Sequence, residues 1–219
     1  MKNTIFLSTV IMTVCACGSE DPGSGKNDAG PMATPFIPIA VGNSWTYRVV
    51  SGSNVESTKV QTIIEEIVVD GEAAYVFETV RANDKGTRSI QRLVDNRLIR
   101  LSEETLSDNL VSGRFNFVPP GLRIDGNFQQ TGETYQDTHD KQKVDANGEI
   151  LETETRAQTF EIESGNELIS VPAGEFNAIR VRRTRSQGTT KTYWFVEGLG
   201  KIKELGGQSE ELVKFVPGN

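Results

Sequence analysis

Cysteine is nearly absent from this 219-residue chain, which has two, Cys15 and Cys17, both close to the N-terminus. The chain beyond them can form no disulfide and offers no thiolate to a metal ion or a reaction. A protein of this length can bury a sufficient hydrophobic core without cross-links. The sequence therefore predicts a domain that is held together by its own core.

Histidine is equally scarce, since His139 is the only one. The sequence also lacks a Gly-x-Ser-x-Gly nucleophile elbow, a glycine-rich phosphate loop, and any cluster of histidines and cysteines at metal-binding spacing. The acidic pairs Glu65–Glu66 and Glu103–Glu104 are sequence neighbours, whose side chains point in different directions on a strand. Residues 145–149 alternate oxygen-bearing side chains but lack the twelve-residue calcium-loop pattern. These absences predict a protein that is not an enzyme and binds no cofactor or metal.

The chain has fewer basic than acidic residues. The 23 lysines and arginines face 30 aspartates and glutamates, which gives a formal net charge of −7. No basic stripe interleaved with aromatic residues is visible. Because nucleic-acid binding depends on neutralising phosphates with Lys and Arg, the sequence excludes nucleic acid as a partner.

The first apolar run, residues 4–14, is too short to cross a bilayer as a mature helix, and the basic Lys2 precedes it. It leads into Val14-Cys15-Ala16-Cys17, which resembles the lipobox of bacterial lipoproteins. By that resemblance residues 1–16 are a lipoprotein signal peptide, cleavage follows Ala16, and Cys17 is acylated. The alternative is an ordinary secretory signal with two incidental cysteines.

Residues 17–35 are rich in Gly, Pro, Ser and Asp, a composition typical of a flexible linker. They are predicted to form a lipidated tether between a membrane and the domain. Gly18 follows Cys17 where, by analogy with better-known lipoproteins, an aspartate would signal retention in the inner membrane. We therefore expect a location in the cell envelope, lipid-anchored to the outer membrane on its periplasmic or its surface face.

Residues 36–219 are predicted to form a single β-rich domain. Short runs of β-branched and aromatic residues alternate with turn signals such as Asp70-Gly71. Both faces of the hairpin around that turn are apolar, so a further element has to cover the second face. We expect an all-β, antiparallel, up-and-down, strongly curved sheet or (half-)barrel of about ten or eleven strands around an apolar interior, with a two-sheet sandwich as the alternative. Residues 102–111 are the only plausible helix.

A polar hairpin is predicted around Asn147-Gly148. Its register pairs Lys141 with Glu154, a cross-strand charge pair that supports the assignment, and places His139 opposite Arg156. Because the surrounding residues are polar and no catalytic motif includes the histidine, we expect His139 to be solvated and without a role in catalysis.

The last long hairpin, within residues 171–205, supplies the candidate binding face. If Gln187-Gly188 is a two-residue loop, Arg182 lies opposite Tyr193 and Arg180 lies opposite Phe195. Guanidinium groups against aromatic rings stabilise each other by roughly 0.5–1 kcal/mol per contact. This face could bind an anionic ligand or a partner protein. The alternative is that the arginines only shield the rings from water.

Three stretches carry a family resemblance: residues 41–47 (VGNSWTY), 171–176 (VPAGEF) and 193–203 (YWFVEGLGKIK). Together they resemble a loosely defined group of uncharacterised bacterial lipoproteins with one β-rich domain, of the kind called TapB-like or a domain of unknown function. The resemblance implies a fold and an envelope location, and it carries over no activity.

The function predicted from these features is non-covalent binding by a cell-envelope lipoprotein. One class of partner is a lipid or small apolar molecule held inside the barrel, and the other is an envelope protein on the Arg–aromatic face. The alternative is a structural or scaffolding lipoprotein whose barrel is filled by its own side chains.

Overall fold

The computed structural model describes residues 36–52, 54–82 and 84–218. The predicted signal peptide (residues 1–16), the predicted tether (residues 17–35) and the predicted lipid attachment at Cys17 lie outside these residues. The described part of the chain contains no helix that is long and apolar enough to span a membrane.

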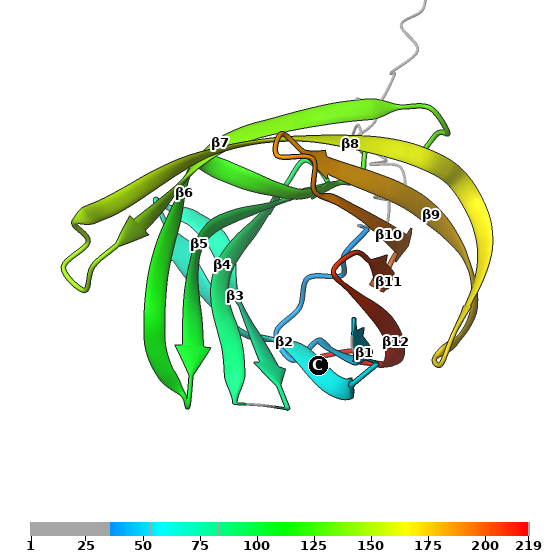
Figure 1. Ribbon diagram of the computed structural model, residues 1–219, viewed down its shortest axis with the longest axis horizontal. Coiled ribbons are helices and arrows are strands. Elements are labelled where there is room, and N and C mark those ends of the chain that lie inside the picture. Colours follow the sequence, from blue (N-terminus) through cyan, green and yellow to red (C-terminus); the bar gives the residue numbers. More distant parts are fainter. Residues whose placement is uncertain (1–35, 53, 83, 219) are drawn as a thin grey trace, which may run out of the picture. The chain divides into compact units, whose positions relative to one another are not determined.

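Twelve β-strands form the domain (Figure 1). Their bounds are β1 Ser44–Ser51, β2 Glu56–Val69, β3 Glu72–Arg81, β4 Lys85–Val94, β5 Arg97–Ser107, β6 Leu110–Asp125, β7 Thr134–Val144, β8 Ile150–Val171, β9 Gly174–Arg185, β10 Thr190–Val196, β11 Gly200–Leu205 and β12 Gln208–Val216.

The strands make a closed barrel in which each strand pairs antiparallel with the next in sequence. Closure comes from β1, which pairs with β2 on one side and with β12 on the other. The predicted all-β, up-and-down fold is confirmed, with twelve strands instead of about ten. The sandwich alternative is wrong, because one continuous sheet covers its own inner face.

Tight turns explain where the strands end, and they correct the prediction of a helix at residues 102–111. These residues form the end of β5 and the start of β6, joined at Asp108-Asn109, whose φ angles are 52° and 63°. Asp and Asn adopt this left-handed conformation more readily than other non-glycine residues, and two such residues in sequence make the hairpin turn that suits twisted strands. The same geometry occurs at Asp95-Asn96.

A β-bulge changes the register within the β2–β3 hairpin. A two-residue loop at Asp70-Gly71 predicts that Glu66 pairs with Tyr75 and Ile64 with Phe77. The first pair is confirmed, but the second is wrong, because the register shifts between Glu65 and Ile63 and Ile63 lies opposite Phe77. A bulge adds one residue to a strand and so exchanges the faces beyond it. Ile63 and Phe77 are both buried in the core as a result.

The hydrophobic core lies inside the barrel. Its largest fully buried apolar side chains come from seven positions, Tyr47, Ile63, Phe160, Ile162, Val181, Ile202 and Leu212. The segment before β1 contributes Phe36, which is buried and packs edge-on against Phe195, with ring centroids 6.2 Å apart. In Figure 1 this segment, drawn in blue, runs within the ring of strands. The apolar core fills only part of the interior.

Candidate functional site

The last hairpin has a different register from the predicted one. Its loop holds three residues, Ser186 to Gly188, because the Arg185 N–H donates to the Thr189 carbonyl oxygen at 3.0 Å. Gly188 has a φ of 80°, which closes a three-residue loop of the bulged type. One extra loop residue shifts every pair, so that Tyr193 lies opposite Val181 instead of Arg182. A shift of one residue moves a side chain to the other face of the sheet.

The predicted Arg–aromatic face is therefore not formed. Tyr193 and Phe195 contribute to the inner wall of the barrel, opposite Val181 and Ile179. Arg180 lies opposite Trp194, and Arg182 lies opposite Thr192, on the outer face.

The two outer arginines are neutralised by glutamates of β8. Arg182 contacts Glu161 at 2.5 Å and Glu163 at 3.3 Å, and Arg180 contacts Glu163 at 3.1 Å and Glu167 at 3.0 Å. Because each arginine is ion-paired with two glutamates, neither is a free cation for a ligand.

His139 lies on the inner wall, and the prediction that it is solvated is wrong. Its side chain is 6% exposed, and its ring packs edge-to-face on Phe117 at 5.5 Å. The predicted register is confirmed, because His139 lies opposite Arg156. The error concerned direction: His139 and Arg156 face the barrel interior instead of the solvent.

The imidazole is held by an aspartate. His139 Nδ1 lies 2.7 Å from Asp137 Oδ2, which also accepts a hydrogen bond from Gln158 Nε2 at 2.8 Å. Asp137 Oδ1 accepts the Leu122 N–H at 3.2 Å. A His–Asp pair is two-thirds of a hydrolase triad, but no serine or threonine hydroxyl of the described residues hydrogen-bonds to His139. Through these hydrogen bonds Asp137 links β6, β7 and β8 on the inner wall of the barrel.

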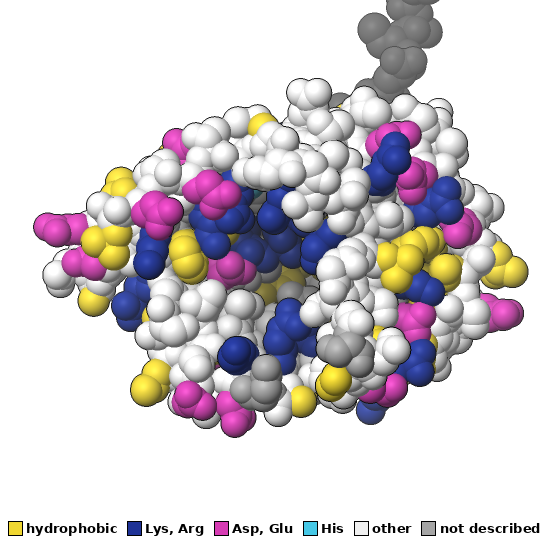
Figure 2. Space-filling model, viewed as in Figure 1, with side chains coloured by type: hydrophobic (Ala, Val, Ile, Leu, Met, Phe, Trp, Pro, Cys, Tyr) yellow, Lys and Arg dark blue, Asp and Glu magenta, His cyan; other side chains and the backbone are white. Residues whose placement is uncertain are grey.

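A cavity of about 250 Å³ occupies the barrel interior, and a smaller pocket of about 40 Å³ adjoins it. Together they are lined by nine lysines and arginines and three glutamates. The basic residues are Lys59, Arg81, Arg100, Arg123, Arg156, Arg183, Arg185, Lys191 and Lys201, and the acidic residues are Glu103, Glu204 and Glu210. Figure 2 shows Lys and Arg side chains gathered around the central hollow of this face.

This lining corrects the prediction of an apolar interior. The lining residues carry six positive charges in excess, although the whole chain has a net charge of −7. Positive charge is therefore concentrated inside the barrel and negative charge outside it. Low-dielectric walls strengthen the field of such a cleft and attract oppositely charged molecules.

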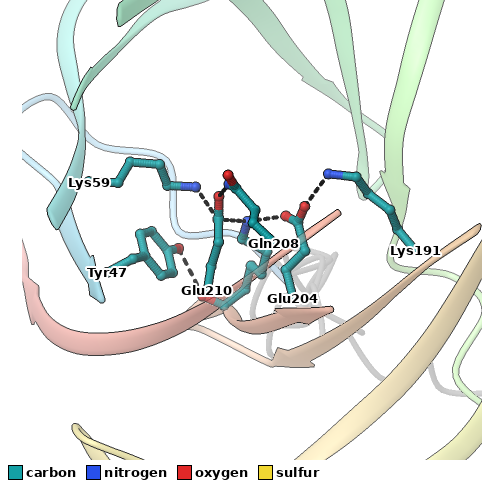
Figure 3. A network of polar contacts seen from close by, with 7 residues as sticks. Tyr47, Lys59, Lys191, Glu204, Gln208 and Glu210 are labelled. Carbon is teal, nitrogen blue, oxygen red and sulfur yellow. Dashed lines mark hydrogen bonds and ion pairs between the residues drawn. The ribbon is translucent and has the colours of Figure 1, made fainter. Parts of the chain in front are cut away.

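One part of the lining is a lysine–glutamate network, comprising Lys59, Lys191, Lys201, Glu204 and Glu210 (Figure 3). Lys201 bridges the two carboxylates, at 2.5 Å from Glu204 and 2.6 Å from Glu210. Lys59 also donates to Glu210, and Lys191 also donates to Glu204. In Figure 3 the side chains converge from β2, β10, β11 and β12. Three ammonium groups share two carboxylates, so the network is almost neutral.

Burial controls the protonation of this network. It lowers the pKa of Lys59 to about 7. The positive charge of Lys201 also lowers this pKa, and the negative charge of Glu210 raises it, but by less. Burial would also lower the pKa of Lys201, but Glu204 and Glu210 together raise it above its ordinary value. Burial opposes ionisation of Glu210, yet Lys201 and Lys59 hold its pKa below the usual range. The network thus keeps both glutamates ionised and leaves Lys59 as its titratable member near neutral pH.

The second part of the lining is an arginine cluster, comprising Arg100, Arg123, Arg156, Arg183 and Arg185. Within the described part of the chain, only two of the five form ion pairs: Arg100 with Glu103, and Arg156 with Glu154 at 2.7 Å. Arg183 is 7% exposed, lies over the Tyr193 ring, and has no partner for its Nε–H among the described residues. The other three, Arg123, Arg183 and Arg185, have no ion-pair partner among the described residues; Arg183 is buried, Arg185 is half-buried and Arg123 is exposed.

Mutual repulsion within the cluster is visible in its pKa values. Burial lowers the pKa of Arg100, and the charges of Arg123 and Arg183 lower it further. Burial likewise lowers the pKa of Arg183 and of Arg185, and in both cases neighbouring arginines add to the effect. Arginine nevertheless stays protonated at neutral pH, so the repulsion between these guanidinium groups persists in the ligand-free protein.

The described residues contain no group of three or more His, Cys, Asp or Glu side chains arranged to hold a metal ion. The alternating residues at the β7–β8 turn form a turn of their own, since Asp145 Oδ1 accepts the N–H groups of Asn147 at 2.8 Å and Glu149 at 2.9 Å.

The sequence reasoning missed the arginine cluster, although a signal was present. Arg183 and Arg185 continue the alternation of the inward residues Ile179 and Val181 along β9. A strand whose inward face changes from aliphatic to arginine predicts a charged section of the interior. This pattern predicts inward arginines only if the register of the β9–β10 hairpin is known. The register depends on whether the loop has two or three residues.

Comparison with known proteins supports the fold. No protein-family model matches the sequence. Among curated proteins, none shows significant similarity. A crystal structure from Bacteroides fragilis, of a protein provisionally described as exported and having a YmcC-like fold, is similar with a TM-score of 0.55 and 11% identity, over 84% of this chain and 100% of that chain. A protein from Parabacteroides distasonis, provisionally described as a lipoprotein, has a TM-score of 0.49 and 12% identity, over 84% and 99%. The resemblance to TapB-like lipoproteins stays a prediction.

Proposed function

We propose that this protein is a lipid-anchored cell-envelope protein whose barrel binds an anionic small molecule non-covalently. The observation that carries the proposal is the excess of six positive charges on the cavity lining of an otherwise acidic chain. Among the unpaired members of this lining Arg183 is buried, and a buried charge without a partner is costly. A bound anion would supply the partners.

The proposed location rests on the N-terminal sequence and on the fold. Val14-Cys15-Ala16-Cys17 supports export and acylation at Cys17, and Gly18 supports the outer membrane. The Bacteroides fragilis protein that shares the fold is itself described as exported, which agrees with an envelope role.

The charge distribution supports binding over scaffolding. In a barrel that is filled only by its own side chains, interior charges are expected to neutralise one another, as they nearly do in the lysine–glutamate network. The arginine cluster leaves three guanidinium groups without an ion pair beside a cavity of about 250 Å³, which is slightly smaller than the roughly 300–1,000 Å³ typical of small-molecule sites. The proposed role is binding without catalysis, and the partner is proposed to bind inside the barrel instead of on its outer wall.

A thermal-unfolding screen tests the proposal. The full-length protein, in a neutral detergent, is heated with matched panels of anionic, neutral and cationic small molecules at constant ionic strength. A molecule that binds only the folded state raises the midpoint of unfolding. We expect shifts from anions alone. Equal shifts from all three panels, or none, would contradict the proposal and favour a scaffolding protein.

A further inference from the structure

The arginine cluster differs from the rest of the lining in a way that specifies the ligand. The lysine–glutamate network has two carboxylates for three ammonium groups, and both carboxylates already accept hydrogen bonds from lysine. The arginine cluster has five guanidinium groups and two carboxylates, one of them on the partly exposed Glu154. Three guanidinium groups therefore have no carboxylate partner among the described residues: the buried Arg183, the half-buried Arg185 and the exposed Arg123.

The free donors of the cluster have a particular chemistry. The Nε atoms of Arg100, Arg156, Arg183 and Arg185 are buried and have no hydrogen-bond partner among the described residues. A guanidinium presents its N–H groups in a planar fork, which matches two oxygens of one phosphate or carboxylate group. Several such forks around one pocket match a ligand group with several oxygens.

The cluster is also fixed in position. Its members come from four strands: Arg100 from β5, Arg123 from β6, Arg156 from β8, and Arg183 and Arg185 from β9. The Tyr193 ring lies 5.3 Å from the Arg183 guanidinium, and the Phe117 ring lies 5.5 Å from that of Arg100. Side chains on rigid strands, supported by rings, lose little freedom on binding.

We propose that the arginine cluster is a binding site for a phosphate-type group that carries two or more negative charges. A single carboxylate would leave two of the three uncompensated charges in place, whereas a phosphate monoester or a diphosphate would neutralise two or three. This inference rests on the proposed function, because it assigns a chemical class to the same cavity. The group could belong to a soluble phosphate or to the headgroup of a lipid.

Isothermal titration calorimetry on the full-length protein in a neutral detergent tests the assignment. The probes are acetate, inorganic phosphate, inorganic pyrophosphate and short-chain dioctanoyl phosphatidic acid, at one pH and one ionic strength. We expect pyrophosphate and phosphate to bind more tightly than acetate by at least about tenfold, because more charge-assisted hydrogen bonds form. Tighter binding of the phosphatidic acid than of phosphate assigns the site to a lipid headgroup, and equal or weaker binding assigns it to a soluble phosphate.

Matched variants connect the binding to the cluster. Arg183→Gln and Arg123→Gln are each expected to weaken pyrophosphate binding by at least about tenfold. Arg123 lies at the exposed edge of the cluster, so its substitution keeps the test valid if the buried Arg183→Gln variant fails to fold. Arg182→Gln removes an outer arginine that pairs with Glu161, and it is expected to leave the affinity unchanged.

Three results would overturn the inference: acetate binding as tightly as pyrophosphate, equal losses from Arg182→Gln and Arg123→Gln, or no binding of any phosphate probe. Failure of the inference can be distinguished from failure of the proposed function. If monovalent anions still raise the midpoint of unfolding in the thermal screen, the barrel binds anions and only the phosphate assignment is wrong. If no anion does, both are wrong.

Discussion

The guanidinium of Arg183 lies over the ring of Tyr193, 5.3 Å from the ring centroid, inside the barrel. The ring supplies a weak cation–π attraction, worth roughly 0.5–2 kcal/mol depending on desolvation. No carboxylate of the described residues pairs with this arginine. The ligand-free protein therefore carries a buried charge that its own residues only partly stabilise.

Replacing Arg183 by methionine is expected to stabilise the ligand-free protein. Methionine keeps much of the apolar volume and removes the uncompensated charge, so the free energy of unfolding should rise by about 1 kcal/mol. Urea denaturation of the two proteins measures the difference. The matched control is Arg182→Met on the outer face, which removes an exposed ion pair and should lower stability by less than about 1 kcal/mol. A larger loss from Arg183→Met than from the control would contradict the account.

Replacing Glu210 by glutamine is expected to destabilise the barrel strongly. Glu210 is 2% exposed and pairs with both Lys59 and Lys201, so its loss leaves the buried Lys201 ammonium with one carboxylate fewer and the buried Lys59 without its partner. Breaking such a pair costs roughly 3–5 kcal/mol. Glu211→Gln, one residue along β12, removes partly exposed contacts to Arg48 and Lys203 and should cost about 1 kcal/mol or less. Similar losses in the two variants, measured by urea denaturation, would show that the network contributes little.

Stability should increase with pH because of Lys59. Its pKa is about 7 in the folded protein, below its ordinary value of 10.5. Between these values the unfolded chain binds a proton that the folded chain lacks, so this residue's contribution to the free energy of unfolding rises with pH from about 7 to about 10. Below pH 7 both states are protonated and the contribution is constant. The free energy of unfolding of the wild type minus that of Lys59→Met, measured at pH 6, 8 and 9.5, should increase with pH. A difference that stays constant or decreases would contradict the prediction.

The last hairpin should depend on the glycine in its loop. Gly188 has a φ of 80° and an open space where a Cβ would stand, so Gly188→Ala introduces backbone strain without a clash. We expect a loss of about 1 kcal/mol. Gly52 has equally open surroundings and no positive φ, and Gly52→Ala should be neutral or slightly stabilising. Equal effects of the two substitutions in thermal unfolding would contradict the loop geometry.

The fold class could be predicted from the sequence because local signals agree with it. The Asp70-Gly71 turn and the Lys141–Glu154 pair each set a hairpin register from neighbouring residues, and both are present in the structure. Periodicity could not reveal the bulge at Ile63 in β2, because a bulge changes the face of a strand without a strong sequence signal.

The site could not be predicted, for two physical reasons. A two-residue loop at Gln187-Gly188 and a three-residue loop that ends at the same glycine have nearly the same sequence signal, but they place Arg182 and Arg183 on exchanged faces. The cluster also combines residues as distant in sequence as Arg100 and Arg185, and only the closure of the barrel brings them to one cavity.

Native mass spectrometry of the full-length protein, purified from bacterial membranes in a neutral detergent, tests the central claim most directly. The account predicts a mass above that of the covalently modified chain, lost on organic or acid extraction, and an extract that contains a negatively charged molecule. The extra mass should persist in Arg182→Gln and disappear in Arg123→Gln. A chain without bound ligand, or a neutral molecule retained equally by both variants, would contradict an anion-binding barrel.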